Sequence, residues 1–121
     1  MLFGVADDGN GEWRGTSGRE ITASAAGKQA VVAGPGLGRW AGDSLWLREL
    51  WSGVIAPLVL DADALNMVAE TIASGEFSSW RPRKAETIVT PPRTAVRSVR
   101  SLRAISSRRC NPSHHQIYLH F

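Results

Sequence analysis

Two carboxylates and an amide in the stretch PLVLDADALN are the residues most suited to chemistry. Asp61 and Asp63 follow the apolar run Leu58–Leu60, which is typical of a strand buried in a parallel sheet, and Asn66 comes one helical turn later. Ligands of open α/β sheets bind where strands end and helices begin. Asp61 and Asp63 could therefore bind a ligand hydroxyl, hold a metal-bound phosphate or act as a base, and Asn66 could turn its amide toward the same crevice. The alternative is structural: one aspartate caps a helix that begins near Ala62.

A second candidate site is the glycine turn GPGLG, which follows the apolar residues AVVA. Its glycines, Gly34, Gly36 and Gly38, would let backbone N–H groups approach a phosphate closely. The same glycines are equally suited to a tight strand-to-helix turn that requires positive φ. The turn matches neither the phosphate loop with its Lys-Ser/Thr pair nor the six-residue dinucleotide fingerprint. Both roles therefore stay open.

Alternating strands and helices are predicted to position these two motifs. Apolar residues at i, i+3, i+4 and i+7 predict a helix over 43–54, with Asp43 or Ser44 as N-cap, and a second helix over 62–73 that stops at Gly75. Short apolar or β-branched runs predict strands at 2–6, 29–33, 58–60 and 87–90. Loops are expected at 7–18 and 78–84. This order predicts an α/β fold with a parallel sheet flanked by helices on both faces.

Composition limits the class of protein. A chain of 121 residues provides one modest domain, and 43% hydrophobic residues with five tryptophans are typical of a globular protein, in which we expect the tryptophans to serve packing. No apolar run approaches the roughly 20 residues that a membrane span needs, and the first residues lack the basic start of a signal peptide. The single Cys110 favours a reducing cytoplasm.

Charge divides the chain into two unlike segments. Residues 1–92 carry eight basic and eleven acidic side chains, a net −3, whereas residues 93–121 carry six arginines and no acid, a net +6. Such a tail could contact nucleic acid. The tail also contains Cys110, His114, His115 and His120, which resemble a zinc cluster in composition but lack its paired spacing. Arginine and serine without acids are also what out-of-frame translation of GC-rich DNA yields.

The two motifs in this order resemble the carbohydrate-kinase-like domain of ADP/ATP-dependent NAD(P)H-hydrate dehydratase, of the ribokinase-like superfamily. The resemblance covers roughly residues 28–91 and includes the final strand motif ETIVTP. It implies a partial ribokinase-like sheet that uses ADP or ATP, with Mg²⁺, to phosphorylate the hydroxyl of hydrated NADH or NADPH, after which phosphate elimination restores the cofactor. It further implies a homo-oligomeric intact enzyme. The implied substrate-binding residues are Gly34, Gly36 and Gly38 near the phosphates, and Asp61, Asp63 and Asn66 beside them.

The chain departs from the family after Pro91. The family continues with a histidine, usually followed by a glycine and a glutamate, whereas this chain reads Pro92-Arg93-Thr94. The late glycine-rich segment with the catalytic aspartate is also missing, so we assign no catalytic residue and no protein-held metal. We hypothesise a frameshift near codon 92, with a partial dehydratase domain at 1–92 and a basic tail at 93–121 outside the native fold. We expect the chain alone to be inactive.

Two alternatives remain from the sequence. A small-molecule kinase of the same superfamily would share the sheet and the glycine turn, and a nucleic-acid-binding module would use the basic tail. The sequence does not distinguish ADP from ATP or NADH hydrate from NADPH hydrate. It also does not show whether an epimerase domain precedes Met1.

Overall fold

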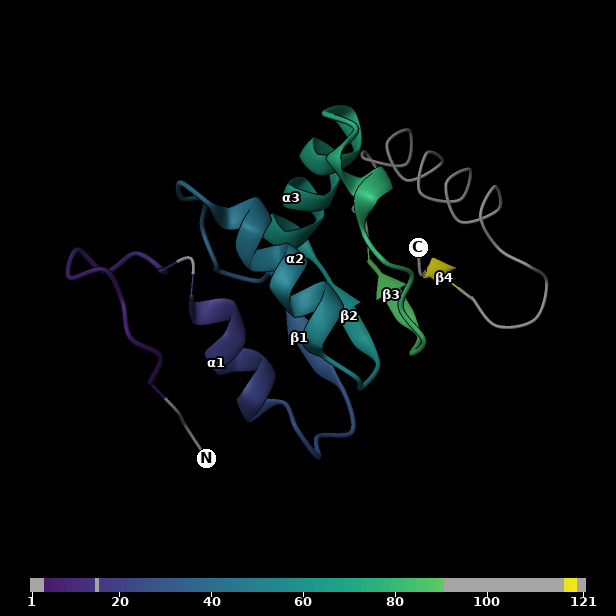
Figure 1. Ribbon diagram of the computed structural model, residues 1–121, viewed down its shortest axis with the longest axis horizontal. Helices are drawn as coiled ribbons and strands as arrows, with labels where there is room; N and C mark the ends of the chain where they lie inside the picture. The colour runs from purple at the N-terminus through teal and green to yellow at the C-terminus, as the bar shows by residue number, and fades with distance from the viewer. Residues whose placement is uncertain (1–3, 15, 91–116, 120–121) are drawn as a thin grey trace.

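The protein contains a parallel sheet of four short strands in the order β1-β2-β3-β4 (Figure 1). The computed structural model describes residues 4–14, 16–90 and 117–119. The strands are β1 (Val31–Ala33), β2 (Leu58–Leu60), β3 (Thr87–Val89) and β4 (Ile117–Leu119). Their pairing is in register, so that Val31, Leu58, Thr87 and Ile117 lie side by side across the sheet. The strand order follows the chain order, which confirms the predicted α/β class.

Helices alternate with the strands. They are α1 (Ser17–Ser24), α2 (Asp43–Gly53) and α3 (Ala62–Ala73), with the short 3₁₀ helix η1 (Glu76–Ser79) after α3. Helix α2 connects β1 to β2 and contacts both α1 and α3. None of the helices in the described ranges is long and apolar enough to cross a membrane.

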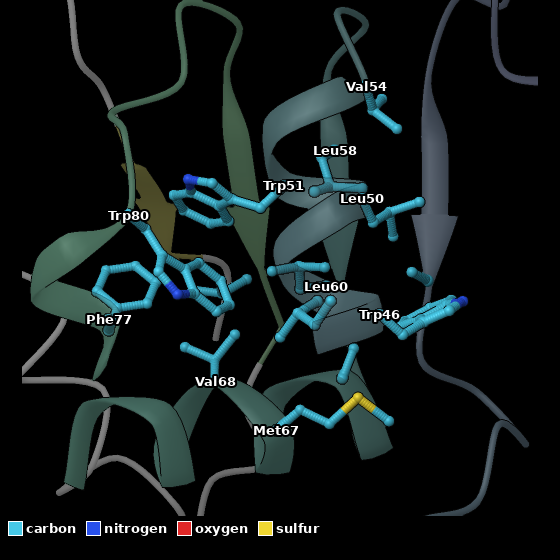
Figure 2. Packing of buried hydrophobic residues seen from close by; sticks show 14 of the residues in the cluster. Trp46, Leu50, Trp51, Val54, Leu58, Leu60, Met67, Val68, Phe77 and Trp80 are labelled. Carbon is cyan, nitrogen blue, oxygen red and sulfur yellow. The ribbon is translucent and has the colours of Figure 1, made fainter. Parts of the chain in front are cut away.

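One hydrophobic cluster lies between the helices and one face of the sheet (Figure 2). Leu58 and Leu60 of β2 are 0% exposed and point into this cluster, where α2 contributes Leu47 and Leu50. Val32 alternates with its neighbours in β1, so it points to the opposite face, where it is 63% exposed. Each described helix contributes to this cluster. Within the described part of the chain, the helices therefore cover one face of the sheet, whereas the sequence predicted helices on both faces.

The five tryptophans pack in two aromatic groups. Trp13, Trp40 and Trp46 form the first, with ring centroids 5.5 to 6.2 Å apart. Trp51 and Trp80 form the second with Phe77 of η1 (Figure 2). The predicted packing role of the tryptophans is therefore confirmed. Trp40 of the first group lies close to the glycine turn in the chain, two residues beyond Gly38.

Element bounds confirm most of the predictions made from periodicity. Strand β2 and helix α3 have the predicted ends, and Gly75 follows α3 with φ 79°. Helix α2 ends one residue early, and its N-cap is Gly42 in the left-handed region instead of Asp43 or Ser44. The strands expected at 29–33 and 87–90 are shorter, as β1 and β3. Part of the loop expected at 78–84 belongs to η1.

The N-terminal region differs from the prediction. Residues 4–6 of the strand expected at 2–6 form no strand, and the pairing there is a single bridge between Asp7 and Trp13. Helix α1 was not predicted. Its first two residues belong to the loop expected at 7–18. It packs on α2 through small residues: a Cβ built on Gly18 would meet Trp46 and Glu49, and one built on Gly53 would meet Thr22. This contact has no apolar period that a sequence pattern could detect.

Strand β4 comes from the basic tail. It pairs with β3 in parallel, with Tyr118 beside Ile88. These three residues are the part of segment 93–121 that the structure describes, so the division of the chain at residue 92 stays a prediction. The tail arginines between 93 and 109, Cys110 and the three histidines lie outside the described residues.

Candidate functional site

The glycine turn connects β1 to the segment before α2 and lies against the junction of β2 and α3. Gly34 has φ 132°, and a Cβ built on it would collide with the backbone carbonyl of Asp61. The amide of Asp61 donates to the carbonyl of Ala33 over 3.0 Å. Glycine is therefore required at position 34, because the backbone of the turn approaches the backbone of Asp61 closely and has positive φ. This is the structural role that the sequence analysis considered for the turn.

Gly36 and Gly38 differ from Gly34 in what surrounds them. Their φ values are 71° and 72°, yet a Cβ built on either would meet nothing within 4 Å. Both residues are exposed at the surface of the turn. Their left-handed backbone favours glycine, and the described part of the chain leaves room for a Cβ at both positions.

Asp61 is the N-cap residue of helix α3. It has extended backbone, and its Oδ1 accepts a hydrogen bond of 2.8 Å from the amide of Ala62. The cap role considered for one of the two aspartates is therefore confirmed for Asp61. Ala62 has φ 45°, a left-handed conformation that a residue with a side chain rarely adopts. The junction of β2 and α3 is thus a tight and sterically demanding connection.

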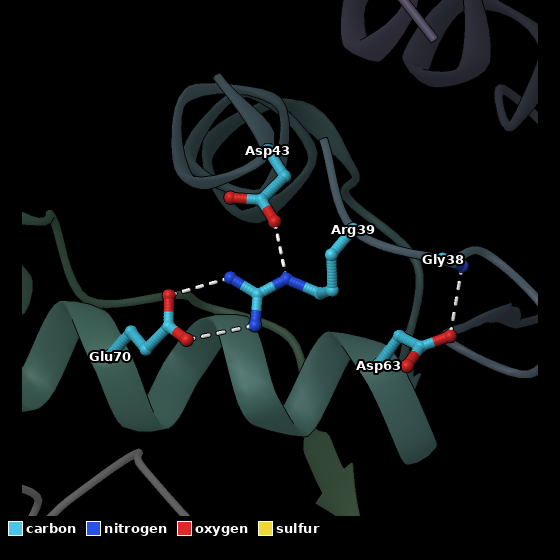
Figure 3. A network of polar contacts seen from close by, with 5 residues as sticks. All are labelled: Gly38, Arg39, Asp43, Asp63 and Glu70. Atoms are coloured by element: carbon cyan, nitrogen blue, oxygen red, sulfur yellow. Dashed lines mark hydrogen bonds and ion pairs between the residues drawn. The ribbon is translucent and has the colours of Figure 1, made fainter. Parts of the chain in front are cut away.

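Asp63 reaches the glycine turn (Figure 3). Its Oδ2 accepts a hydrogen bond of 2.9 Å from the backbone N–H of Gly38. Asn66 is exposed on α3, and its amide is not among these contacts. Of the six predicted residues, the structure brings Gly34 against Asp61 and Gly38 against Asp63. Gly36 lies on the same turn.

A network around Arg39 borders the turn and was not predicted from the sequence. Its Nε donates to Asp43 over 2.5 Å, and its two terminal nitrogens donate to the two carboxylate oxygens of Glu70 over 2.9 and 2.6 Å (Figure 3). The carboxylates raise the pKa of Arg39, and the Arg39 hydrogen bonds lower the pKa of Glu70. The signal available in the sequence was the seven-residue spacing from Asp63 to Glu70, which places both on one side of α3.

The end of the turn meets the beginning of α3. The N–H of Gly38 donates to Asp63 in the first turn of that helix, where helix polarity favours negative charge. Within residues 4–14, 16–90 and 117–119, no three His, Cys, Asp or Glu side chains gather into a metal site. No step below depends on a metal held by the protein.

Comparison with known families identifies the family of the chain. The model of the NAD(P)H-hydrate dehydratase family matches residues 11–107. The chain belongs to this family. The match is longer than the resemblance at 28–91 and continues beyond residue 92 into the basic tail. It includes every predicted site residue and the Arg39 network.

Curated relatives agree with the family. The bifunctional NAD(P)H-hydrate repair enzyme Nnr of Thermanaerovibrio acidaminovorans is 37% identical over 73 residues, which are 59% of this chain and 14% of that protein. The enzyme of the same name from Salinibacter ruber is 43% identical over 54 residues, which are 42% of this chain and 10% of that protein. The chain thus spans a small part of the length of these relatives. No solved structure matches the chain.

Proposed function

We propose that this chain carries the phosphate-binding part of a nicotinamide-nucleotide repair dehydratase. In the complete reaction, ADP or ATP phosphorylates the hydroxyl of NADH hydrate or NADPH hydrate, and loss of phosphate with a proton restores the reduced cofactor. Family membership and the names of the two relatives support this substrate class. The proposed binding residues are Gly34, Gly36 and Gly38 in the turn with Asp61, Asp63 and Asn66 at the β2–α3 junction.

The observation that carries the proposal is the hydrogen bond between Gly38 and Asp63. A backbone N–H of the turn donates to a carboxylate oxygen over 2.9 Å, at the beginning of α3. An oxygen of a phosphate has similar charge and hydrogen-bonding capacity, so the turn presents its donors in a direction suited to an anion. Gly36 lies beside open space two residues earlier, where a phosphate has room to approach the backbone.

We expect the chain alone to bind a nucleotide without completing the reaction. The catalytic aspartate segment implied by the resemblance does not occur in the sequence, so the site has no assigned base. Mg²⁺ would enter with the phosphates of ADP or ATP, because it is bound largely through substrate phosphates in such sites. We place the protein in the cytoplasm, on its single cysteine, and expect the intact enzyme to form a homo-oligomer.

Binding is tested by titrating the full chain with NADPH and with ADP while tryptophan fluorescence is recorded. The diagnostic variant is Gly36→Ala, and its matched control is Gly27→Ala. Both glycines have φ near 70° and open space for a Cβ, at 71° and 75°, so each substitution costs about 1–2 kcal/mol of backbone strain. Only Gly36 belongs to the turn. We expect weaker binding in Gly36→Ala alone; equal affinity in both variants would contradict the proposed site.

Activity is tested separately with NADPH hydrate and either ADP or ATP, each with Mg²⁺. We expect no recovery of absorbance at the wavelength of the reduced nicotinamide. Recovery that depends on the added ADP or ATP would show that the chain is an active dehydratase, and would refute its inactivity while supporting the proposed substrate.

A further inference from the structure

The glycine turn needs contacts outside itself to keep one conformation. Three of its five residues are glycines, which lose more conformational freedom on ordering than other residues. Inside the turn, the amide of Leu37 donates to the carbonyl of Gly34 over 3.2 Å. The other anchors are Asp61 against Gly34 at the beginning and Asp63 bonded to Gly38 at the end. Both of these anchors belong to one junction, that of β2 and α3.

Arg39 adds an anchor to two further elements. It directly follows Gly38, and its Nε is bonded to Asp43, the first residue of α2. Its terminal nitrogens are bonded to both oxygens of Glu70 in α3. Each of the three guanidinium nitrogens therefore donates to a carboxylate. A forked, two-oxygen contact fixes the orientation of the guanidinium plane as well as its position.

The members of this network differ in exposure. The side chains of Arg39 and Glu70 are 34% and 67% exposed, so solvent screens the charge interaction between them. Asp43 is the buried member, at 10% exposed. The network connects the end of the turn to two helices.

We propose that Arg39 is a positioning residue that holds the glycine turn in its anion-binding conformation through Asp43 and Glu70. The inference rests on the proposed function for its consequence: a turn that is already ordered binds phosphate without an added entropy cost. Each of the three nitrogens of Arg39 already donates to a carboxylate of the protein, and the role that we assign to it is exerted through the backbone of the turn.

The test compares Arg39→Lys and Glu70→Gln with Arg19→Lys in the full chain. Arg19 forms the matched exposed ion pair, from its Nε to Glu49 over 3.0 Å between α1 and α2, away from the turn. Lysine keeps the charge of arginine but cannot form the forked contact. Three quantities are measured: hydrogen exchange of the Leu37 and Gly38 amides by NMR, the Tm, and the affinity for pyrophosphate and for NADPH.

We expect Arg39→Lys and Glu70→Gln to raise the exchange rates of these two amides about tenfold, with exchange in α1 and β2 unchanged. Affinity should fall about threefold or more, because the ordering cost returns on binding. Arg19→Lys should change neither the exchange rates of these two amides nor the affinity. Unchanged turn exchange in both Arg39→Lys and Glu70→Gln would overturn the inference, as would a rise spread evenly over the molecule.

The exchange measurement needs no ligand, so it separates this inference from the proposed function. A wild-type chain that binds neither pyrophosphate nor NADPH would contradict the proposed function, while turn-specific exchange would still support the positioning role of Arg39. Wild-type binding with unchanged turn exchange in the variants would support the function and overturn the role of Arg39.

Discussion

Helix α2 is held at each end by an arginine, and the two arginines work differently. At the amino end, Arg39 donates to Asp43 and Glu70 and keeps 34% of its side chain exposed. At the carboxyl end, Arg83 is 8% exposed and donates to the backbone carbonyls of Trp51, Val54 and Ala56 over 2.6 to 2.8 Å. One residue type therefore serves a surface network at one end and a buried cap at the other.

The surroundings move the pKa of the two guanidinium groups in opposite directions. The hydrogen bonds that Arg39 donates to Glu70 and Asp43 raise the pKa of Arg39, whereas burial lowers the pKa of Arg83. Arg83 also lies 5.8 Å from the centre of the Trp51 ring, and its buried Nε has no hydrogen-bond partner among the described residues. The cost of burying Arg83 is offset by its hydrogen bonds to three carbonyls in the last turn of α2 and just beyond it.

Removing Arg83 should have the largest effect. Arg83→Met leaves the carbonyls of Trp51, Val54 and Ala56 without their donor, and each buried unsatisfied group costs about 1–3 kcal/mol, so we expect a loss of about 3 kcal/mol or more. The measurement is urea denaturation. Arg81→Met is the control, because Arg81 is exposed and its backbone carbonyl, which accepts from Trp51 Nε1, is kept in the variant. Equal losses in both variants would contradict the capping role.

In the glycine turn that precedes α2, the free energy of unfolding should depend on steric fit and not on charge. Gly34→Ala forces a Cβ against the backbone of Asp61, and we expect a loss of about 2–3 kcal/mol from strain and displacement. Gly36→Ala has room for its Cβ and should lose about 1–2 kcal/mol from its backbone conformation alone. Thermal unfolding of both variants measures the difference. A smaller loss in Gly34→Ala than in Gly36→Ala would refute the close approach of the turn to Asp61.

The beginning of α3 provides an intermediate effect. Asp61 caps α3 through its side chain, whereas α2 begins at Gly42 without a side-chain cap. Asp61→Ala should therefore destabilise the protein by about 1 kcal/mol, the usual cost of losing a cap. Asp61→Asn, which keeps an oxygen acceptor, is the control and should recover most of that loss. Urea denaturation of the two variants decides the point.

Acid should release one arginine and leave the other in place. The pKa of Glu70 is lowered from its ordinary value of 4.5, so its contribution is present above pH 4.5 and is lost as the pH falls through the lower folded value. Arg83 is bonded to carbonyls, which do not titrate in this range. We expect the NMR signals of the terminal Nη–H groups of Arg39, which donate to Glu70, to shift as the pH falls below 4.5, while those of Arg83 stay constant. Parallel shifts would contradict this difference.

Local patterns predicted the elements that position the site. The ends of β2 and α3 agree with the apolar run at 58–60 and the helical period at 62–73, because both elements bury a regular face in the core. Helix α1 was missed because its contact with α2 uses Gly18 and Thr22, which give no hydrophobic period. The strand expected near the N-terminus has no pairing partner at residues 4–6.

The candidate site was predicted in its residues but not in its contacts. The cap at Asp61 follows from its place before the helix, a local rule. The contacts from Asp63 to Gly38 and from Glu70 to Arg39 join residues 25 and 31 positions apart. Such pairs depend on how α3 lies against the turn, which is set by packing of the whole cluster. A pattern read along the chain contains no such distance.

The tryptophan group beside the turn provides an optical probe of its state. The rings of Trp13 and Trp40 are stacked at 6.2 Å with planes 28° apart, and Trp46 lies edge-on to Trp40 at 5.5 Å. Indole rings this close couple their electronic transitions, so the group should contribute a paired band to the circular dichroism spectrum. Trp40 is the residue after Arg39, so a displaced turn would change this band. The chain thus contains an unlabelled spectroscopic reporter for the segment on which its proposed function depends.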